Sequence, residues 1–292
     1  MMNVRADGLD IMDKRRPAVS FLYRTFLGRL LLKVLTHPAF SERAGKFLSS
    51  RFSRRLIPSF IRRNKIDLSE CESTDFASFN DCFTRRIKPE LRPVDSDPAA
   101  LISPCDGMLS AYRIDSGLIL PIKQSDFSVA DLLEDQELAD RFEDGLCLVF
   151  RLRVGDYHRY VFFDSGLAHM PREIPGKLHA VSPIALRKYP VFTENSREIT
   201  LIDTDNFGTA AQIEVGALVV GRIDNHPLCT ADTSGIAPVK RGAEKGCFLF
   251  GGSTIIILLE KDRAELLSGE LDGMSGEVEI PVRLGQRVGT AK

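Results

Sequence analysis

Residues 245–260 read KGCFLFGGSTIIILLE, in which two glycines and a serine lead directly into a row of β-branched and other apolar residues. Such a row predicts a buried β-strand, and the glycine pair before it predicts a tight turn or a bulge. Similar short apolar runs, broken by Gly, Pro, Asn and Asp, recur from about residue 101 onwards, at 118–122, 146–152, 160–163 and 211–223. These runs predict strands of a mostly β domain.

The whole pattern predicts an α+β fold, with a mostly antiparallel β domain over residues 67–292 and minor helices. One of the minor helices is expected at residues 129–142, where leucines and a phenylalanine recur at helical spacing. The apolar fraction of 43% and the charged fraction of 27% are typical of a globular protein.

The first 66 residues differ from the rest in charge. Residues 14–63 carry thirteen Lys or Arg side chains against one acid, Glu42, which gives this segment a net charge of +12. Apolar residues interleave with the cations over 21–35 and 47–63, which predicts amphipathic helices, and Pro58 is expected to kink or end the second one.

Two interpretations of residues 1–66 stay open. One is a helical layer packed on the domain with solvated cations, and the other is a basic amphipathic helical region that docks on an anionic membrane. Nucleic acid is not expected as a partner, because no recognised nucleic-acid motif accompanies the basic residues.

Cysteine and histidine spacing argues against a disulfide framework and against a metal site. The six cysteines form no CxxC pair, and the five histidines form no HExxH or other paired ligand spacing. A reducing compartment is therefore expected. No uncharged apolar run of about 18 residues is present, and the first residues lack the apolar core of a secretory signal, so neither a membrane span nor export is expected.

Ser253, which follows the glycine pair, has two possible meanings. Serine after glycine is common in ordinary turns before a strand. Glycine also permits strained backbone, and in such a turn the serine hydroxyl can attack the carbonyl of Gly252 to give an ester in place of the amide. Elimination from that ester and hydrolysis would release ammonia and leave a pyruvoyl group at the new N-terminus. The spacing alone does not decide between the two.

Seven segments, taken in order, resemble the phosphatidylserine decarboxylase family. They are FNDCFTRRIKPELRPVD (79–95), SPCDG (103–107), DYHRY (156–160), IPGKLHAVSPIAL (174–186), FTENSRE (192–198), VGALVVGRI (215–223) and KGCFLFGGST (245–254). The chain is most similar to pyruvoyl-dependent members that carry GGST at the processing serine. The resemblance implies self-cleavage between Gly252 and Ser253 into chains 1–252 and 253–292, with Ser253 becoming a covalent pyruvoyl cofactor.

The resemblance also implies roles for residues in the other segments. Asp106 in SPCDG matches the aspartate of the charge relay that activates the serine, although an Asp-Gly pair by itself is more typical of a turn. His158 in DYHRY matches the first histidine of the family's YHRxH pattern and is a candidate general acid in turnover. The position of the second histidine is occupied by Val161.

This departure matters because a serine hydroxyl needs a nearby base to attack an amide at a useful rate. Three alternatives stay open: His158 serves alone, His179 in GKLHAV supplies the missing base, or the chain does not process itself. Arg197 and backbone N–H groups are further candidates for contacts to a substrate phosphate.

The resemblance implies decarboxylation of phosphatidylserine to phosphatidylethanolamine. A peripheral protein on the cytoplasmic face of a membrane is expected, with a bacterial inner membrane as the first choice and an organelle's membrane left open. The expected partners are anionic phospholipid, the two chains of the one precursor and, as a possibility, a second copy in a homodimer. Two rivals stay open. One is an uncleaved member that only binds anionic phospholipid, and the other is a pyruvoyl enzyme acting on a different serine-containing lipid or on a soluble amino acid. A soluble substrate would make the basic amphipathic segment unnecessary.

Overall fold

The computed structural model describes residues 17–36, 38–115, 118–122, 125–180, 185, 189–217, 222–228, 233–250, 253–267 and 279–292. In this part of the chain every strand pair is antiparallel, and helices are few within the β domain, which confirms the predicted α+β class.

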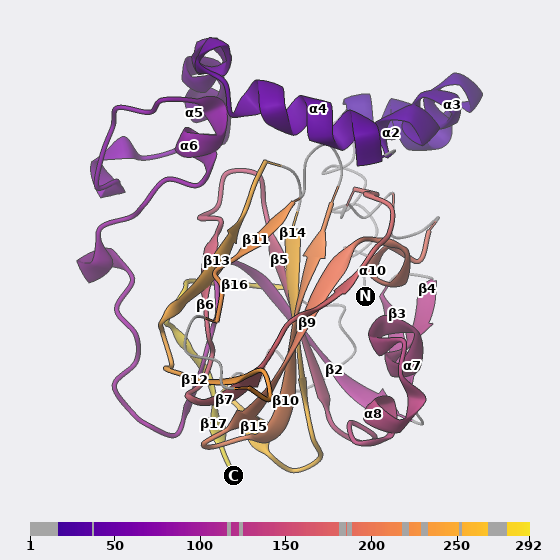
Figure 1. Ribbon diagram of the computed structural model, residues 1–292, viewed down its shortest axis with the longest axis vertical. Coiled ribbons are helices and arrows are strands. Elements are labelled where there is room, and N and C mark those ends of the chain that lie inside the picture. Colours follow the sequence, from indigo (N-terminus) through magenta and orange to yellow (C-terminus); the bar gives the residue numbers. More distant parts are fainter. Residues whose placement is uncertain are drawn as a thin grey trace, which may run out of the picture.

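One large sheet forms the centre of the molecule (Figure 1). Its strands are β2 (Gly107–Asp115), β3 (Leu118–Ile122), β4 (Ser125–Ser128), β5 (Leu146–Leu152), β7 (Gly166–His169), β9 (Arg197–Thr204), β10 (Gly208–Gly216), β12 (Ile236–Val239) and β14 (Ser253–Leu259). They are ordered β12-β7-β9-β10-β14-β5-β2-β3-β4, and β8 (Arg172–Ile174) and β16 (Ile280–Val282) pair with β9 and β2.

Two small sheets of three strands lie beside the large one. The first contains β1 (Ala100–Ile102), β17 (Arg287–Ala291) and β15 (Ala264–Leu266), and the second contains β11 (Ile223–Asn225), β13 (Glu244–Phe248) and β6 (Arg159–Val161). In the second sheet Cys247 lies opposite Arg159, so the DYHRY and KGCFLF segments are adjacent although they are far apart in sequence.

β14 is central because both of its faces are covered. Ile256 and Leu258 belong to one buried cluster, while Ile255, Ile257 and Leu259 belong to the cluster on the other face. Alternation along a strand sends successive side chains to opposite faces, so a strand buried on both sides reads as an unbroken apolar run. The strand predicted at residues 255–259 is confirmed for this reason.

Most of the other predicted runs also form strands, and 118–122 and 146–152 coincide with β3 and β5. The run at 211–223 does not form one strand. The ladder of β10 with β14 ends at the Gly216–Ser253 pair, and β11 begins only at Ile223. Residues 218–221 lie outside the described part of the chain.

The single helix expected over residues 129–142 is wrong, because two short helices, α7 (Val129–Leu133) and α8 (Gln136–Asp140), occupy this segment. Glu134 ends α7 in the left-handed conformation, with φ 49°. The carboxylate of Asp135 then caps α8 by accepting a hydrogen bond from the Leu138 N–H at 3.0 Å. The helix α10 (Val191–Glu194) follows later in the chain.

The N-terminal segment forms helices α2 (Pro17–Arg24), α3 (Phe26–Leu35) and α4 (Pro38–Leu48), which lie across one end of the central sheet (Figure 1). The helix predicted over 21–35 is therefore divided at Thr25, whose hydroxyl donates to the Phe21 carbonyl at 2.9 Å. Gly28 allows α3 to approach α2, because a Cβ at this position would lie 2.1 Å from the Phe21 carbonyl oxygen.

The chain continues through η1 (Arg51–Leu56), α5 (Ile57–Asn64), η2 (Leu68–Glu70), α6 (Phe79–Phe83) and η3 (Pro89–Leu91). The prediction that Pro58 kinks or ends a helix is wrong. Pro58 lies in the first turn of α5, where its missing N–H costs no hydrogen bond. Phe60 of α5 packs with Phe79 and Phe83 of α6 in a third apolar cluster, and Leu249 and Phe250 of the GGST segment pack against the same cluster. The helical layer therefore covers the segment that leads to Ser253.

Candidate active site

Ser253 is the first residue of β14 and lies between two neighbouring strands. It is paired with Leu152 at the end of β5 and with Gly216 at the end of β10. Its side chain is fully buried, and its hydroxyl has no hydrogen-bond partner within the described residues. A buried polar group without a partner is rare and calls for a functional reason. Gly252, the other half of the predicted cleavage site, lies outside the described residues.

His158 follows the β5 strand and is completely buried. Its ring lies over Phe83 with 3.9 Å between the centroids, and Phe83 in turn contacts Phe250, three residues before Ser253. The backbone also brings it to this segment, because its carbonyl accepts a hydrogen bond from the Phe248 N–H at 2.9 Å. His158 is therefore tied to the segment that precedes the predicted cleavage site.

The hydrogen bonds of His158 determine its tautomer. Nδ1 lies 2.9 Å from the Asp156 carbonyl oxygen, which can only accept, so Nδ1 carries the proton. Nε2 is then an unprotonated acceptor, and it has no partner within the described residues. Burial lowers the pKa of His158 from 6.5 to about 3, against the contrary effect of the Asp156 hydrogen bond. The ring is therefore neutral at pH 7 and presents one free basic nitrogen.

His179 is also buried but has a different environment. Its ring is stacked on Tyr189 at 4.4 Å, and neither ring nitrogen makes a hydrogen bond within the described residues, although Nε2 is 3.4 Å from a Glu194 oxygen. Burial lowers its pKa, with the Glu194 charge acting in the opposite direction. Tyr189 packs against the apolar cluster that contains Ile256, whereas alternation along β14 places the Ser253 side chain on the face of Ile255.

Asn195 links His179 to the strand beside Ser253, and sequence reasoning assigned it no role. Its side-chain N–H groups donate to the carbonyls of His179 at 2.8 Å and Gly216 at 2.7 Å, and its oxygen accepts from the His179 N–H at 2.9 Å. Gly216 is the residue opposite Ser253. The FTENSRE segment contained the only sequence signal for this amide.

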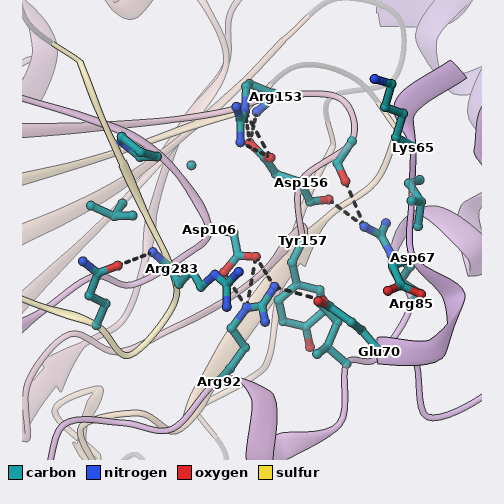
Figure 2. Close-up of a pocket in the computed structure, with 17 residues that line it drawn as sticks. Lys65, Asp67, Glu70, Arg85, Arg92, Asp106, Arg153, Asp156, Tyr157 and Arg283 are labelled. Carbon is teal, nitrogen blue, oxygen red and sulfur yellow. Dashed lines mark hydrogen bonds and ion pairs between the residues drawn. The ribbon is translucent and has the colours of Figure 1, made fainter.

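Asp106 precedes Gly107, the first residue of β2, and its carboxylate is held by an arginine. Figure 2 shows the Arg92 guanidinium between the carboxylates of Asp106 and Glu70. Arg92 donates to Asp106 from Nε at 2.9 Å and from Nη2 at 2.7 Å, and the Leu284 N–H donates to the same carboxylate at 2.9 Å. Asp106, Arg92 and Glu70 line a polar cavity of about 530 Å³ that Asp156 also borders.

Asp106 and Ser253 share one end of the sheet but are not neighbours. β5 lies between their strands, so they are separated by about two strand spacings, or about 10 Å. Within the described residues, the contacts of the Asp106 carboxylate are to Arg92 and Leu284, not to His158 or Ser253.

Val161 occupies the position of the missing histidine, and its backbone lies against the SPCDG segment. Its N–H donates to the Pro104 carbonyl at 2.9 Å, while its carbonyl accepts from the Gln212 side chain at 3.2 Å. The valine side chain belongs to the apolar cluster of Ile255 and Ile257. Position 161 is therefore close to the turn that carries Asp106, but it has no group that can exchange a proton.

A buried polar network on the Ser253 face of the sheet was not predicted. Lys245 of β13 and Glu214 of β10 form a fully buried ion pair with 2.5 Å between Nζ and Oε2. Asn225 donates to Glu214 at 3.2 Å and to Glu198 at 2.6 Å, and it accepts from the Tyr160 hydroxyl at 3.0 Å. Burial raises the pKa of Tyr160 and, with the nearby Glu214 charge, that of Glu198.

Arg197 is not available for a substrate phosphate in this arrangement. Its guanidinium is buried and donates to the carbonyls of Leu132, Thr193, Asn195 and Asp131 and to the Glu134 carboxylate. It ties α7 to the start of β9 and thereby supports Asn195. Within the described residues no group of three or more His, Cys, Asp or Glu side chains has the geometry of a metal site.

The chemistry that this end of the sheet can perform is proton transfer to and from a buried serine. It contains a partnerless hydroxyl, a neutral imidazole with a free nitrogen and a carboxylate neutralised by an arginine. A hydroxyl, a base and a carboxylate are the functional groups needed when a serine attacks a carbonyl and a base removes the hydroxyl proton.

Comparisons with known proteins agree on one family. A sequence profile described as phosphatidylserine decarboxylase matches residues 79–290. Phosphatidylserine decarboxylase proenzyme 2 of Clostridium acetobutylicum is 41% identical over 272 residues, which cover 93% of this chain and 91% of the relative. The phosphatidylserine decarboxylase proenzymes of Ruminiclostridium cellulolyticum and of Chlamydia trachomatis serovar L2 are 40% and 38% identical, over 92% and 93% of this chain and 89% and 90% of the relatives.

Proposed function

Because the chain belongs to the phosphatidylserine decarboxylase family, we propose that it converts phosphatidylserine to phosphatidylethanolamine with a pyruvoyl group formed from its own serine. The group would arise by self-cleavage between Gly252 and Ser253, which divides the chain into residues 1–252 and 253–292. The observation that carries the proposal is the Ser253 hydroxyl, buried and partnerless at the first residue of a central strand. A serine that attacks its own peptide bond needs such a free hydroxyl, so the residues present fit the group.

His158 is the proposed base for self-cleavage. Its free Nε2 can take the Ser253 hydroxyl proton while the oxygen attacks the Gly252 carbonyl carbon. The amide nitrogen leaves with a proton, which gives an ester, and elimination followed by hydrolysis releases ammonia and leaves the pyruvoyl group. His179 is the second candidate, ranked lower because its stack with Tyr189 packs on the opposite face of β14.

Asp106 is proposed as the relay carboxylate, together with Arg92. The arginine holds the carboxylate at the sheet end that carries Ser253, and opening of the Arg92 contact would free it to orient the histidine. The test is Asp106→Asn, which keeps the shape and removes the charge. Fragment formation should slow by about 10²-fold or more, and an unchanged rate would remove Asp106 from the relay.

In turnover the pyruvoyl group supplies a ketone carbonyl that withdraws electrons from the substrate carbon as the carboxylate leaves. The protein must then deliver a proton to that carbon. His158 is the candidate for this step because its Nε2, which has no partner within the described residues, can accept a proton and return it. Its burial also keeps bulk water from competing for the proton.

The helices over residues 1–66 are proposed to dock the enzyme on an anionic membrane, as a peripheral protein of the cytoplasmic face. Support comes from the side chains that the helical layer leaves exposed, which include Phe26, 79% exposed, and Leu27, 65% exposed. Arginines and lysines alternate with them, each contributing about 1 kcal/mol near an anionic surface. Within the described residues no helix is both long enough and apolar enough to cross a bilayer.

Docking can be tested by flotation with vesicles of phosphatidylserine and phosphatidylcholine. Phe26→Ser with Leu30→Ser should reduce bound protein by about tenfold, because two exposed apolar side chains are removed. The matched control is Leu267→Ser, which changes an equally exposed leucine of the β domain and should have little effect. Equal binding by both variants would favour a helical layer with merely solvated cations.

Self-cleavage can be tested by the intact mass of the purified protein. Two chains, of 252 and 40 residues with the shorter one blocked at its N-terminus, are expected in place of one chain of 32.5 kDa. Ser253→Ala should remain uncut and inactive, and activity that survives this change would refute the pyruvoyl proposal. Assays with phosphatidylserine, other serine lipids and free serine distinguish the proposed substrate from its alternatives.

A further inference from the structure

A second cavity, of about 700 Å³, lies between the helical layer and the end of the sheet that carries Ser253. Helix α4 forms one wall with Ser41 and Lys46, and another wall is formed by Ile174 at the end of β8 and by Gly176 in the turn after it. Arg222 and Leu249 line it from the two segments that precede β11 and β14. The cavity is thus bounded by the proposed membrane-docking region on one side and by active-site segments on the other.

A single hydrogen bond connects the inner wall of this cavity to the residue that is paired with Ser253. Ser196, which lines the cavity, accepts a hydrogen bond from the Gly216 N–H at 2.9 Å, and Gly216 is paired with Ser253. On the other side the Leu249 N–H donates to the Arg222 carbonyl at 3.0 Å, four residues before Ser253. A small molecule in the cavity would therefore lie next to the residue proposed to become the reactive group.

Glu198 presents a carboxylate to this cavity from the same face of the sheet as the Ser253 side chain. It is paired with Glu214, and Glu214 is paired with Ile255, whose face Ser253 shares. One Glu198 oxygen accepts from Asn225 at 2.6 Å, and its other oxygen has no hydrogen bond within the described residues. Burial raises its pKa, with Glu214 and Glu173 adding to the rise and Asn225 and Lys245 opposing it, so it is a stronger base than an exposed glutamate.

Arg222 presents the opposite charge to the same cavity. Its side chain is exposed and makes no hydrogen bond or ion pair within the described residues. Lys46, another cation at the cavity, is instead paired with Glu42 at 2.7 Å. The free guanidinium suits an anionic phosphate, which it can bind with two parallel hydrogen bonds.

We propose that this cavity is the subsite for a glycerophosphoserine headgroup, in which Glu198 binds the ammonium group and takes one of its protons while Arg222 binds the phosphate. The inference rests on the proposed function, whose substrate carries both groups. The proton step is balanced: the ammonium nitrogen loses one proton and keeps its electron pair as a neutral amine, and the Glu198 carboxylate becomes a carboxylic acid. A neutral amine is what must be present before the nitrogen can attack a carbonyl carbon.

The proposal can be tested by binding, without relying on activity. Ser253→Ala serves as the parent, because it stays one chain and cannot turn over. Calorimetric titration uses three soluble probes: glycerophosphoserine, glycerophosphoglycerol, which lacks the ammonium group, and inorganic phosphate. The variants are Glu198→Gln, which keeps an acceptor for Asn225, Arg222→Gln, and the control Glu137→Gln on the exposed surface of α8.

Glu198→Gln should weaken glycerophosphoserine binding by about 10- to 100-fold and leave glycerophosphoglycerol within about twofold, because only the first probe has an ammonium group. Arg222→Gln should weaken both probes by about tenfold or more, and Glu137→Gln should change neither. Inorganic phosphate should bind the parent at least about tenfold more weakly than glycerophosphoserine, which distinguishes a headgroup site from a site for free phosphate.

Three results would overturn the proposal. They are binding by the Glu198 and Arg222 variants equal to that of the parent, equal weakening of both organic probes by Glu198→Gln, and no binding of glycerophosphoserine to the parent at about 10 mM. The proposed function fails separately, if the processed enzyme forms no phosphatidylethanolamine. Binding without activity would support the subsite and refute the proposed decarboxylation. Activity without the expected binding pattern would support the decarboxylation and refute the subsite.

Discussion

The buried imidazole of His158 makes a quantitative prediction about stability in acid. Burial lowers the pKa of His158 from 6.5 to about 3 in the folded chain, while the unfolded chain exposes the ring and restores the ordinary value. Between these two pKa values the unfolded state binds more protons than the folded state. The stability associated with the neutral ring is therefore complete above the unfolded-state pKa, and it is lost as the pH falls toward the folded-state pKa. Linkage gives a loss of about 3 kcal/mol in the free energy of unfolding near about pH 4.5 and almost none near about pH 7.

The perturbation is His158→Gln, which removes the titrating ring and keeps an amide that can donate to the Asp156 carbonyl. From about pH 7 to about pH 4.5 the free energy of unfolding should fall by about 2–3 kcal/mol more in the parent than in the variant. Urea unfolding followed by circular dichroism measures this difference. Ser253→Ala is present in both proteins so that each remains one chain, and comparing them cancels the carboxylates common to both.

An equal pH dependence in the two proteins would refute the reasoning. It would mean that the ring has an ordinary pKa in the folded chain, and hence that water reaches it. The proposed base would then be protonated in mild acid, and self-cleavage would lose its rate below about pH 6.5 instead of persisting to more acidic values. The time course of fragment formation at several pH values checks this consequence independently.

Two further predictions concern residues around the serine. Lys245→Met should destabilise the uncut chain by about 3–5 kcal/mol in urea unfolding, because Glu214 is left buried without its cation. Adding Glu214→Gln should recover part of that loss, and additive losses from the two substitutions would contradict the pairing. Val161→His should accelerate fragment formation on denaturing gels by about tenfold, because position 161 adjoins the Asp106 turn; no acceleration would place this position out of reach of Ser253.

The strands were predictable because their signal is local. A run of β-branched residues between turn residues marks β14, and burial on both faces explains why it shows no polar alternation. The helix boundaries were less predictable, because capping and close approach decide them. Glu134 in a left-handed conformation and Gly28 against the Phe21 carbonyl interrupt segments whose apolar spacing is continuous.

The candidate site was only partly predictable, because the residues that contact one another in it are far apart along the chain. Ser253 and His158 could be chosen from the resemblance of short segments, but their chemical states depend on neighbours from other strands. The Asp106–Arg92 contact joins residues of two segments, and the Lys245–Glu214 pair joins two residues that are 31 positions apart on different strands. No periodicity within one segment contains this information, because register between strands decides which charges meet.

The burial of Ser253 also sets the order of events in the proposed reaction. In the intact chain its side chain is fully enclosed between β5 and β10, under a helical layer that packs on Phe250. A lipid headgroup in the neighbouring cavity can contact Ser196 and Leu249, but it cannot touch an atom that is already surrounded by protein. Self-cleavage must therefore come first, since only a break before Ser253 frees the start of β14 from the preceding chain. Glu198 and Arg222, which already face the cavity, can bind a headgroup before or after that break, so binding to uncut protein and failure to react with it should coexist.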